Sequence, residues 1–189
     1  MIRVRDLTVR FNGVEGLRLD TLDIAASERI GICGPNGSGK TTLLRVLAGL
    51  LAPTRGEVAG VPPPGRTVLV HQHPYFFRGT ARGNVVFALR LKHRPPAEAD
   101  MWLDRLGIGR LADRTAQVLS AGERRRVAVA RALAAAPEVL LLDEPFAALD
   151  DEGCGSLRTA LEDFKGTLVI AAPHVDDAPV DRVVELGPQ

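Results

Sequence analysis

Residues 34–41 read Gly-Pro-Asn-Gly-Ser-Gly-Lys-Thr, a spacing of glycines, lysine and hydroxyl that suits phosphate binding. Glycines allow successive backbone N–H groups to turn toward an anion. Lys40 can reach the β- and γ-phosphates of a nucleotide, and the Thr41 hydroxyl can bind Mg²⁺. A plain glycine-rich turn would not explain Lys-Thr at this spacing. The residues expected to contact nucleotide are Gly34, Asn36, Gly37, Ser38, Gly39, Lys40, Thr41 and Thr42.

Two acidic residues follow a second apolar segment. Residues 139–142 read Val-Leu-Leu-Leu, as in a parallel strand buried on both faces. Acids at the carboxyl end of such a strand face the crevice where ligands bind. We therefore expect Asp143 to hold Mg²⁺ and Glu144 to act as general base on the attacking water. The alternative is a strand that ends in a solvated acidic turn.

A helix start carries a third candidate site. Ser120 and Glu123 have the S-x-x-E spacing of a capping box. The same helix N-terminus could receive an anion, and the two roles are compatible. The three arginines that follow, at 124–126, predict a solvated or interface face.

Elements of two kinds must position these residues. Segments 29–33, 67–70, 139–142, 167–172 and 183–186 read as strands, and residues 42–48 and 157–164 as helices. Residues 1–24 predict two further strands around a turn at Asn12-Gly13. We expect an α/β fold with a mostly parallel sheet, an N-terminal antiparallel β portion and an inserted helical lobe. The core would span 1–73 and 137–189, and the lobe about 74–136, within a single domain.

Composition limits the function classes. The 189 residues include 24 Lys and Arg and 23 Asp and Glu, so the formal net charge of +1 gives no basis for a nucleic-acid partner. Two cysteines make no disulfide framework. No apolar run approaches the ~18 residues that span a membrane, and no secretory signal opens the chain. We expect a cytoplasmic protein.

In their order and spacing, these motifs resemble the ATP-binding cassette of ABC transporters, a P-loop NTPase, over nearly the whole chain. Residues 34–41 look like the Walker A loop, 140–144 like Walker B with its catalytic glutamate, and 119–123 like the L-S-G-G-Q signature. The resemblance implies ATP and Mg²⁺ as ligands. It also implies that Ser120 and Gly122 contact the nucleotide held by a partner subunit.

Four further residues acquire roles only through this resemblance. Gln72 looks like the Q-loop glutamine, which serves both metal binding and catalysis. His174 looks like the catalytic switch histidine, and Asp150 like the D-loop aspartate near the nucleotide. Phe11 falls where the family places an aromatic ring that stacks on adenine; ordinary core packing is the alternative.

The sequence departs from the family pattern in the signature and around the switch histidine. Ala121 replaces the first signature glycine, and Glu123 replaces the glutamine. The switch histidine follows Pro173, and Val175 stands where an aspartate often follows. The extra Cβ of Ala121 predicts slower turnover, and for His174 a polar residue that ends a strand is the alternative to a catalytic role.

The resemblance implies a homodimer, or a heterodimer of cassettes, that closes around two MgATP and drives a separate integral membrane permease. Residues 80–91 and 143–150 look like those of bacterial importers, which implies a position on the inner face of the membrane and a possible extracytoplasmic binding protein. Since the sequence stops shortly after the last expected strand, we expect no C-terminal regulatory domain. The alternatives are a soluble ABC ATPase of repair, translation or cluster assembly, and a regulatory module without turnover. The transported solute is not encoded in these motifs.

Three contiguous aromatic residues, at 75–77, follow Gln72 in a chain that is only 4% aromatic. In the family this is where the helical lobe meets the permease. Internal packing of the lobe is the equal alternative, and both can hold for different rings.

Overall fold

The computed structural model describes residues 1–176 and 178–187, and the chain divides into two compact units. The first unit comprises residues 1–69, 138–144 and those from 165 onward, and the second comprises 70–137 and 145–164. The second unit thus includes residues 145–164, which the sequence assigned to the core, because their helix packs on other helices of this unit.

The first unit contains an antiparallel sheet of three strands in the order β2-β1-β4. The strands are β1 (Ile2–Phe11), β2 (Val14–Ile24) and β4 (Arg55–Ala59). Between β1 and β2, Asn12 and Gly13 have φ of 51° and 85°, the paired positive values that a type I′ hairpin turn requires. The expected antiparallel portion is confirmed, with β4 as an addition.

A second sheet of five strands has the order β5-β6-β7-β3-β8. Its strands are β3 (Arg29–Cys33), β5 (Thr67–Val70), β6 (Val139–Asp143), β7 (Thr167–Ala171) and β8 (Arg182–Glu185). The pairs β6–β7, β7–β3 and β3–β8 are parallel, and every residue of β6 and β7 is buried. Continuous apolar strands therefore mark the centre of the sheet, as predicted.

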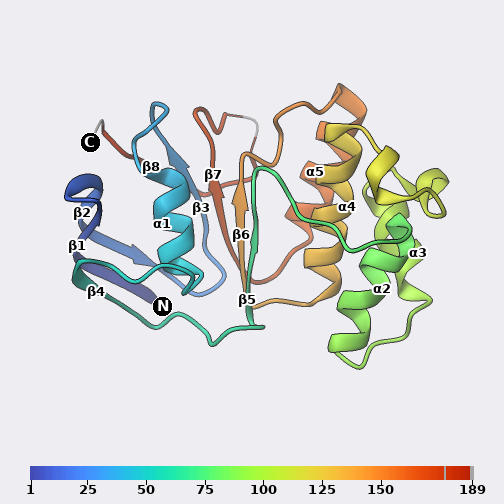
Figure 1. The fold of residues 1–189 in the computed structure, drawn as a ribbon, viewed down its shortest axis with the longest axis horizontal. Helices are drawn as coiled ribbons and strands as arrows, with labels where there is room; N and C mark the ends of the chain where they lie inside the picture. Colours follow the sequence, from blue (N-terminus) through green and yellow to red (C-terminus); the bar gives the residue numbers. More distant parts are fainter. Residues whose placement is uncertain (177, 188–189) are drawn as a thin grey trace. The chain divides into compact units, whose positions relative to one another are not determined.

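Helix α1 (Lys40–Leu47) lies between the two sheets of the first unit (Figure 1). Leu43, Leu44 and Leu47 are fully buried against apolar residues of both sheets. This packing fixes the helix whose first residue is Lys40, and so fixes the loop before it. The predicted α/β fold with a mostly parallel sheet is confirmed.

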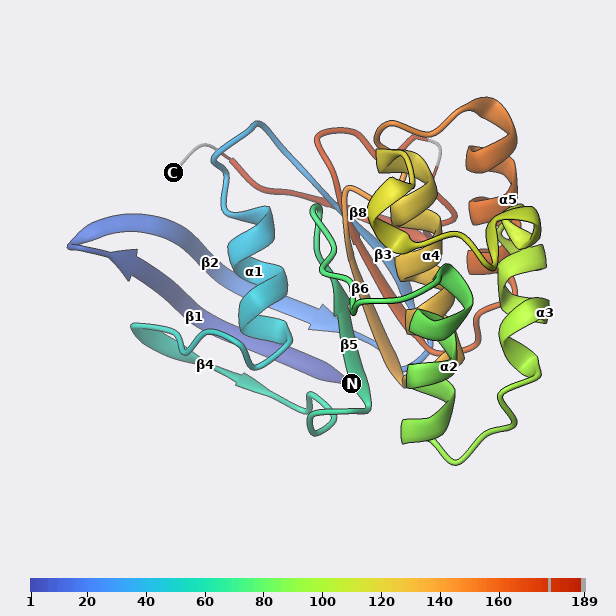
Figure 2. The same ribbon diagram turned by 45° about the vertical axis from the view of Figure 1, so that its right-hand side comes forward.

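The second unit is helical (Figure 2). It contains α2 (Ala81–Leu91), α3 (Glu98–Arg105), α4 (Ala121–Ala134), α5 (Asp151–Glu162) and the short 3₁₀ turns η1 (Gly109–Leu111) and η2 (Ala116–Val118). Helix α4 contacts α2, α3 and α5, because small alanine and valine side chains let its neighbours approach. Its first turn carries the signature residues.

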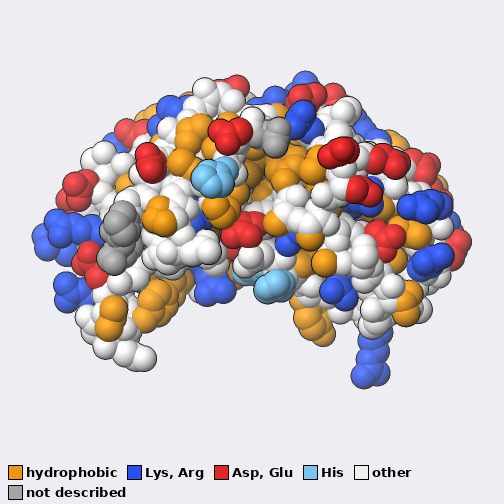
Figure 3. All heavy atoms as spheres, turned by 90° about the horizontal axis from the view of Figure 1, so that it is seen from above, with side chains coloured by type: hydrophobic (Ala, Val, Ile, Leu, Met, Phe, Trp, Pro, Cys, Tyr) orange, Lys and Arg blue, Asp and Glu red, His pale blue; other side chains and the backbone are white. Residues whose placement is uncertain are grey.

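Across the part of the chain that the structure describes, no helix has the length and apolar character needed to cross a bilayer. The longest, α4, has 14 residues, short of the ~20 that a spanning helix needs. Acidic and basic side chains alternate on the face drawn in Figure 3, with apolar side chains between them.

Candidate nucleotide-binding and hydrolysis site

Three neighbouring parallel strands of the first unit end at one edge of the sheet. Ala171 of β7 pairs with Ile32 of β3 on one side and with Asp143 of β6 on the other. The loop after β3, the acids after β6 and His174 beyond β7 therefore leave the sheet side by side. This is the edge where open parallel sheets bind ligands.

The loop between β3 and α1 is shaped by its glycines. Gly34, Gly37 and Gly39 have φ of 143°, 85° and 89°. A Cβ on Gly34 would lie 2.3 Å from the Leu186 carbonyl oxygen, and one on Gly39 would lie 2.8 Å from the Gly16 carbonyl oxygen. Neither position can take a side chain without moving backbone. A Cβ on Gly37 meets nothing within 4 Å, so that part of the loop is open.

The polar groups of this loop fit a polyphosphate. Lys40 is only 6% exposed, and its Nζ donates to the carbonyl oxygens of Gly34 at 2.7 Å and Pro35 at 2.8 Å. The ammonium thus lies across the loop. Ser38 Oγ is buried, with no hydrogen-bond partner among the described residues. Buried polar atoms normally have partners, so this orphaned hydroxyl suits a bound phosphate oxygen.

Thr41 and Asp143 form a candidate metal site. Thr41 Oγ1 donates to Asp143 Oδ2 at 2.8 Å, and Asp143 is 5% exposed. Mg²⁺ prefers oxygen ligands and often takes only one or two from protein, with water and substrate phosphates completing the shell. Within the described residues no group of three or more His, Cys, Asp or Glu could form an all-protein cage. A hydroxyl and a carboxylate beside a phosphate loop fit a metal shared with nucleotide.

Glu144 has an uncommon backbone conformation. Its φ of 49° lies in the left-handed region, which costs roughly 1–3 kcal/mol for a residue with a side chain. Its N–H donates to the Ala171 carbonyl oxygen at 2.7 Å, which holds the turn in place. Such conformations persist where the surroundings fix them, often at functional sites. The turn directs Glu144 away from the line of β6, next to Asp143.

His174 is exposed beyond β7. Before it, Ala172 N–H donates to the Ile32 carbonyl oxygen of β3 at 3.1 Å, and after it the Val175 side chain is buried, with 7% of the residue exposed. A Cβ on Gly31 would lie 2.9 Å from Val175 Cγ2. Packing on Gly31 therefore explains why an apolar residue follows the histidine here.

Phe11 lies at the hairpin tip and is 45% exposed. Its ring covers Gly16, since a Cβ there would lie 2.7 Å from a ring carbon. Gly16 in turn contacts Gly39 of the phosphate loop. Gly16 thus lies between the Phe11 ring and the phosphate loop, and part of the ring surface is exposed.

The other candidate residues belong to the helical unit. Ser120 caps α4 in a complete capping box: Glu123 N–H donates to Ser120 Oγ at 3.2 Å, and Ser120 N–H donates to Glu123 Oε2 at 2.8 Å. This confirms the capping prediction. The N–H of Ser120 favours the carboxylate, and so lowers the pKa of Glu123 below its usual value.

Replacing Glu123 should remove part of this cap. We expect Glu123→Ala to lower the free energy of unfolding at pH 7 by about 1 kcal/mol. Because the folded state depresses the pKa of Glu123, its contribution is present above the unfolded value of about 4.3 and disappears as pH falls through the folded value. Urea unfolding at pH 7 and at acidic pH should show a larger difference at pH 7, because protonation removes the charge of Glu123. An equal difference at both would contradict a charged cap.

The segment before α5 packs on the signature turn. Gly122 is buried, and a Cβ on it would lie 2.6 Å from the Ala148 carbonyl oxygen. Ala148 itself has φ of 59°. Asp150 caps α5, with Oδ1 accepting from Gly153 N–H at 2.8 Å. The helical unit thus brings Gly122 and the segment containing Asp150 together.

Two of the three arginines after the signature are buried, so the solvated face, one of the two alternatives that the sequence predicted, is wrong for them. Arg125 and Arg126 are each 6% exposed, and Arg124 is half-buried. Arg125 Nη2 donates to the Gln72 carbonyl oxygen at 3.1 Å, and its Nη1 donates to that of Ala147. Gln72 is therefore held through its backbone by α4.

A further arginine of α4, Arg131, whose role the sequence did not predict, organises the aromatic segment. The Arg131 guanidinium carbon lies 5.3 Å from the Phe76 ring centroid and 5.7 Å from that of Phe77, and its Nη2 donates to the Tyr75 carbonyl oxygen at 2.8 Å. Burial lowers the pKa of Arg131, which stays charged at neutral pH. Buried Asn84 also holds Phe77, by accepting from its N–H at 3.0 Å. Phe76 is thus half-buried, whereas Phe77 is 42% and Tyr75 78% exposed.

Comparison with known proteins agrees with this geometry. The family model described as "ABC transporter" matches residues 17–147. Sulfate/thiosulfate import ATP-binding protein CysA of Pseudomonas putida is 39% identical over 98% of this chain and 64% of its own length. CysA of Bordetella pertussis is 41% identical over 92% of this chain and 54% of its own length. The chain therefore spans about half to two thirds of the length of these curated relatives.

Solved structures show the same fold. The ATP-binding cassette MJ0796, solved as a dimer in a post-hydrolysis state with ADP and Pi, has a TM-score of 0.86 and 27% identity over 98% of this chain and 94% of its own. CbiO1 from Clostridium perfringens, described as part of the ABC transporter complex cbiONQ, has a TM-score of 0.80 and 29% identity over 98% and 84%.

Proposed function

Because this chain belongs to the ABC transporter family of ATP-binding proteins, we propose that it hydrolyses ATP as the energy-supplying subunit of a bacterial importer. The observation that carries the proposal is the phosphate loop with Lys40 across it and Thr41 hydrogen-bonded to Asp143. The importer assignment follows the names of relatives that are 39–41% identical.

Within this proposal each residue of the first unit has a distinct role. Lys40 exchanges its two loop carbonyls for phosphate oxygens, and the loop N–H groups and Ser38 complete the cradle. Thr41 and Asp143 hold Mg²⁺, which when bound neutralises developing charge on the phosphates. Glu144 accepts the proton of the attacking water. Phe11 offers its uncovered ring to the adenine.

The residues of the helical unit act with a partner. Ser120 and Gly122 stand at the N-terminus of a 14-residue helix, which favours an anion. We assign them to the nucleotide held by a second cassette, identical or homologous, and MJ0796 is a relative solved as a dimer. We assign Gln72 to metal binding and catalysis, His174 to catalysis, and Asp150 to nucleotide contact.

The proposed partner outside the dimer is an integral membrane permease, with the cassette on the cytoplasmic face and an extracytoplasmic binding protein on the other. Sulfate and thiosulfate are the first solutes to test, since they appear in the names of the relatives. The second candidate is a soluble ABC ATPase without permease.

Reconstitution separates these two functions. The cassette should copurify with a permease from the same genome, and ATP hydrolysis in proteoliposomes should drive solute uptake. ATP hydrolysis by a chain that binds no permease would favour the soluble ATPase. A chain that binds no nucleotide would overturn both.

Replacing Phe76 and Phe77 together by Ser should weaken copurification with the permease while MgATP binding persists, because a docking helix would lose its apolar contacts. Both rings also contact Arg131, so Tyr75→Ala is the cleaner companion; its exposed ring contributes little to folding. Leu50→Ser, at another exposed apolar position, is the control. Unchanged copurification of Tyr75→Ala and of a folded double variant would leave internal packing as the role of these rings.

A further inference from the structure

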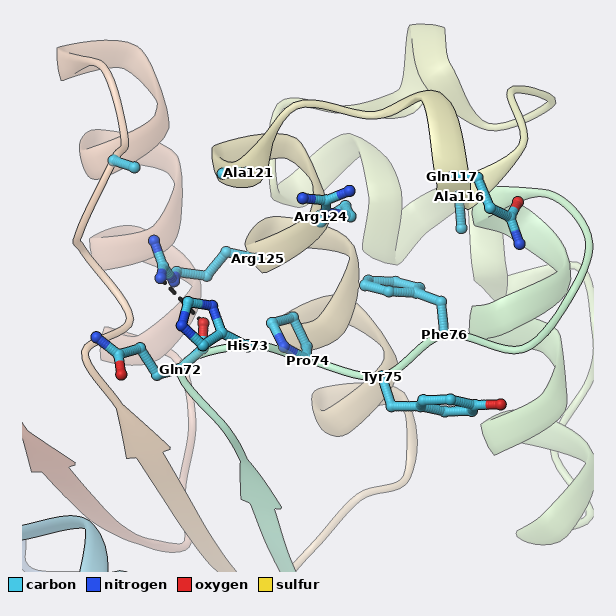
Figure 4. A pocket seen from close by; sticks show the side chains of 11 residues that line it. Gln72, His73, Pro74, Tyr75, Phe76, Ala116, Gln117, Ala121, Arg124 and Arg125 are labelled. Carbon is cyan, nitrogen blue, oxygen red and sulfur yellow. Dashed lines mark hydrogen bonds between the residues drawn. The ribbon is translucent and has the colours of Figure 1, made fainter.

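Arg125 joins two segments of the helical unit that are distant in sequence. Figure 4 shows it reaching from α4 toward Gln72, and both residues line a pocket of about 420 Å³. Its two bonded carbonyls belong to Gln72, 53 residues before it, and to Ala147, 22 residues after it. Both oxygens are backbone atoms, so the contact fixes chain position rather than a side-chain rotamer.

The choice of arginine has a physical reason. A buried guanidinium is costly unless its N–H groups are hydrogen-bonded, and Arg125 is 6% exposed. Its planar fork donates to the two carbonyls from separate nitrogens in fixed directions, whereas the ammonium of lysine donates from a single nitrogen at the end of a flexible stem. A residue that served only to fill space in α4 would not need this charge.

The contact that Arg125 makes lies one helical turn after the signature residues. Arg125 is in the second turn of the helix that Ser120 caps, and Gly122 of the first turn packs on Ala148, next to Ala147. The Gln72 segment, the 147–150 segment and the start of α4 therefore meet at one side chain.

We propose that Arg125 is a positioning residue that locks the Gln72 and Ala147–Asp150 segments to the signature helix. This rests on the proposed function in one respect: these three segments act in ATP hydrolysis. A change at any one of them is transmitted to the other two through the guanidinium.

The matched control is Arg126, the next residue of the same helix. It is buried to the same 6%, but its Nη1 donates to the Leu106 carbonyl oxygen at 3.3 Å, in a different segment. Arg125→Ala and Arg126→Ala thus remove equally buried charges from neighbouring positions and release different backbone.

Backbone ¹⁵N relaxation of the free protein tests the lock without reference to activity. In Arg125→Ala, order parameters at both 72–73 and 147–149 should fall from the rigid value of about 0.85 to below about 0.6. In Arg126→Ala these two segments should stay ordered. If Arg125→Ala does not fold, Arg125→Lys takes its place, because it keeps the charge but not the fork. Ordered segments in the folded Arg125 variant would overturn the proposal.

Steady-state kinetics then tests the functional consequence. The folded Arg125 variant should lose about tenfold in kcat while the KM for ATP stays within about twofold, since the phosphate loop is untouched. Loosened segments with unchanged kcat would overturn the role in turnover. If the wild-type chain itself hydrolyses no ATP, the proposed function fails, and the relaxation result still decides the structural lock.

Discussion

Glu144→Gln is expected to bind MgATP as the wild type does and to hydrolyse it roughly 100- to 10,000-fold more slowly, the usual contribution of a positioned general base. The amide keeps the size and a hydrogen-bonding oxygen but cannot accept a proton at neutral pH. Binding should persist because Lys40, Thr41 and Asp143 supply the contacts to phosphate and metal. Single-turnover hydrolysis and nucleotide affinity, measured on the same preparation, separate the two effects.

Glu138→Gln is the matched control for this variant. Glu138 immediately precedes β6, the strand that ends at Asp143, and forms an exposed ion pair with Arg66. Its replacement should leave both affinity and rate near the wild-type values. If Glu144→Gln hydrolyses ATP at close to the wild-type rate, the base lies elsewhere, and His174 becomes the candidate to replace next.

Local sequence signals predicted the elements around the phosphate site but not all of their bounds. Strands β3, β6 and β7 are short apolar runs that only a buried parallel sheet accommodates, so pattern and position agree. Helix α5 begins at Asp151, six residues before the predicted start at 157. Gly153 and Gly155 weaken the helical pattern there, and the cap from Asp150 supplies the start signal that the apolar pattern hid.

Strand β4 had no such signal. Of its five residues, Val58 is the one that is half-buried, and the other apolar side chain, the final alanine, is exposed. Gly56 has φ of 83° and lies against the backbone of Asp6, where the register with β1 shifts. A strand held by pairing along a bulged edge leaves little periodicity to detect.

The candidate site likewise contains residues that the sequence predicts and residues that it does not. Gly34, Lys40, Thr41 and Asp143 were predictable because phosphate and metal chemistry fixes residue types at fixed spacings. Arg125 was not, since its partners are backbone carbonyls, which leave no trace in residue type. Three consecutive arginines predict a solvated or interface face, and only the fold reveals the carbonyl oxygens that bind Arg125 and Arg126 in the interior.

Ser120→Arg and Lys40→Ala should each be nearly inactive alone and partly active when mixed. Lys40→Ala removes the ammonium that lies across the phosphate loop, so MgATP affinity should drop at least tenfold, about 1.4 kcal/mol. Ser120→Arg leaves that loop intact but fills the half-site that the partner's nucleotide would use. It should bind ATP as a monomer and fail to dimerise or turn over.

The expected recovery of activity in the mixture depends on each site being shared between two subunits. In a mixed dimer one composite site combines the intact Lys40 of one chain with the intact Ser120 of the other, while the second site carries both changes. Hydrolysis should therefore return to a level well below that of the wild type, because coupling between the two sites limits the lone intact one.

Stability must be separated from this effect, since Ser120 also caps α4 and its loss costs roughly 0.5–2 kcal/mol. Thermal unfolding of each variant, measured before mixing, identifies any loss of folded protein. Absence of rescue from two folded variants, of which Ser120→Arg is shown to bind ATP, would weigh against independently working shared sites. Full activity of Ser120→Arg alone, maintained as protein concentration rises, would exclude the shared-site dimer, because no second subunit could then place an intact signature against the bound nucleotide.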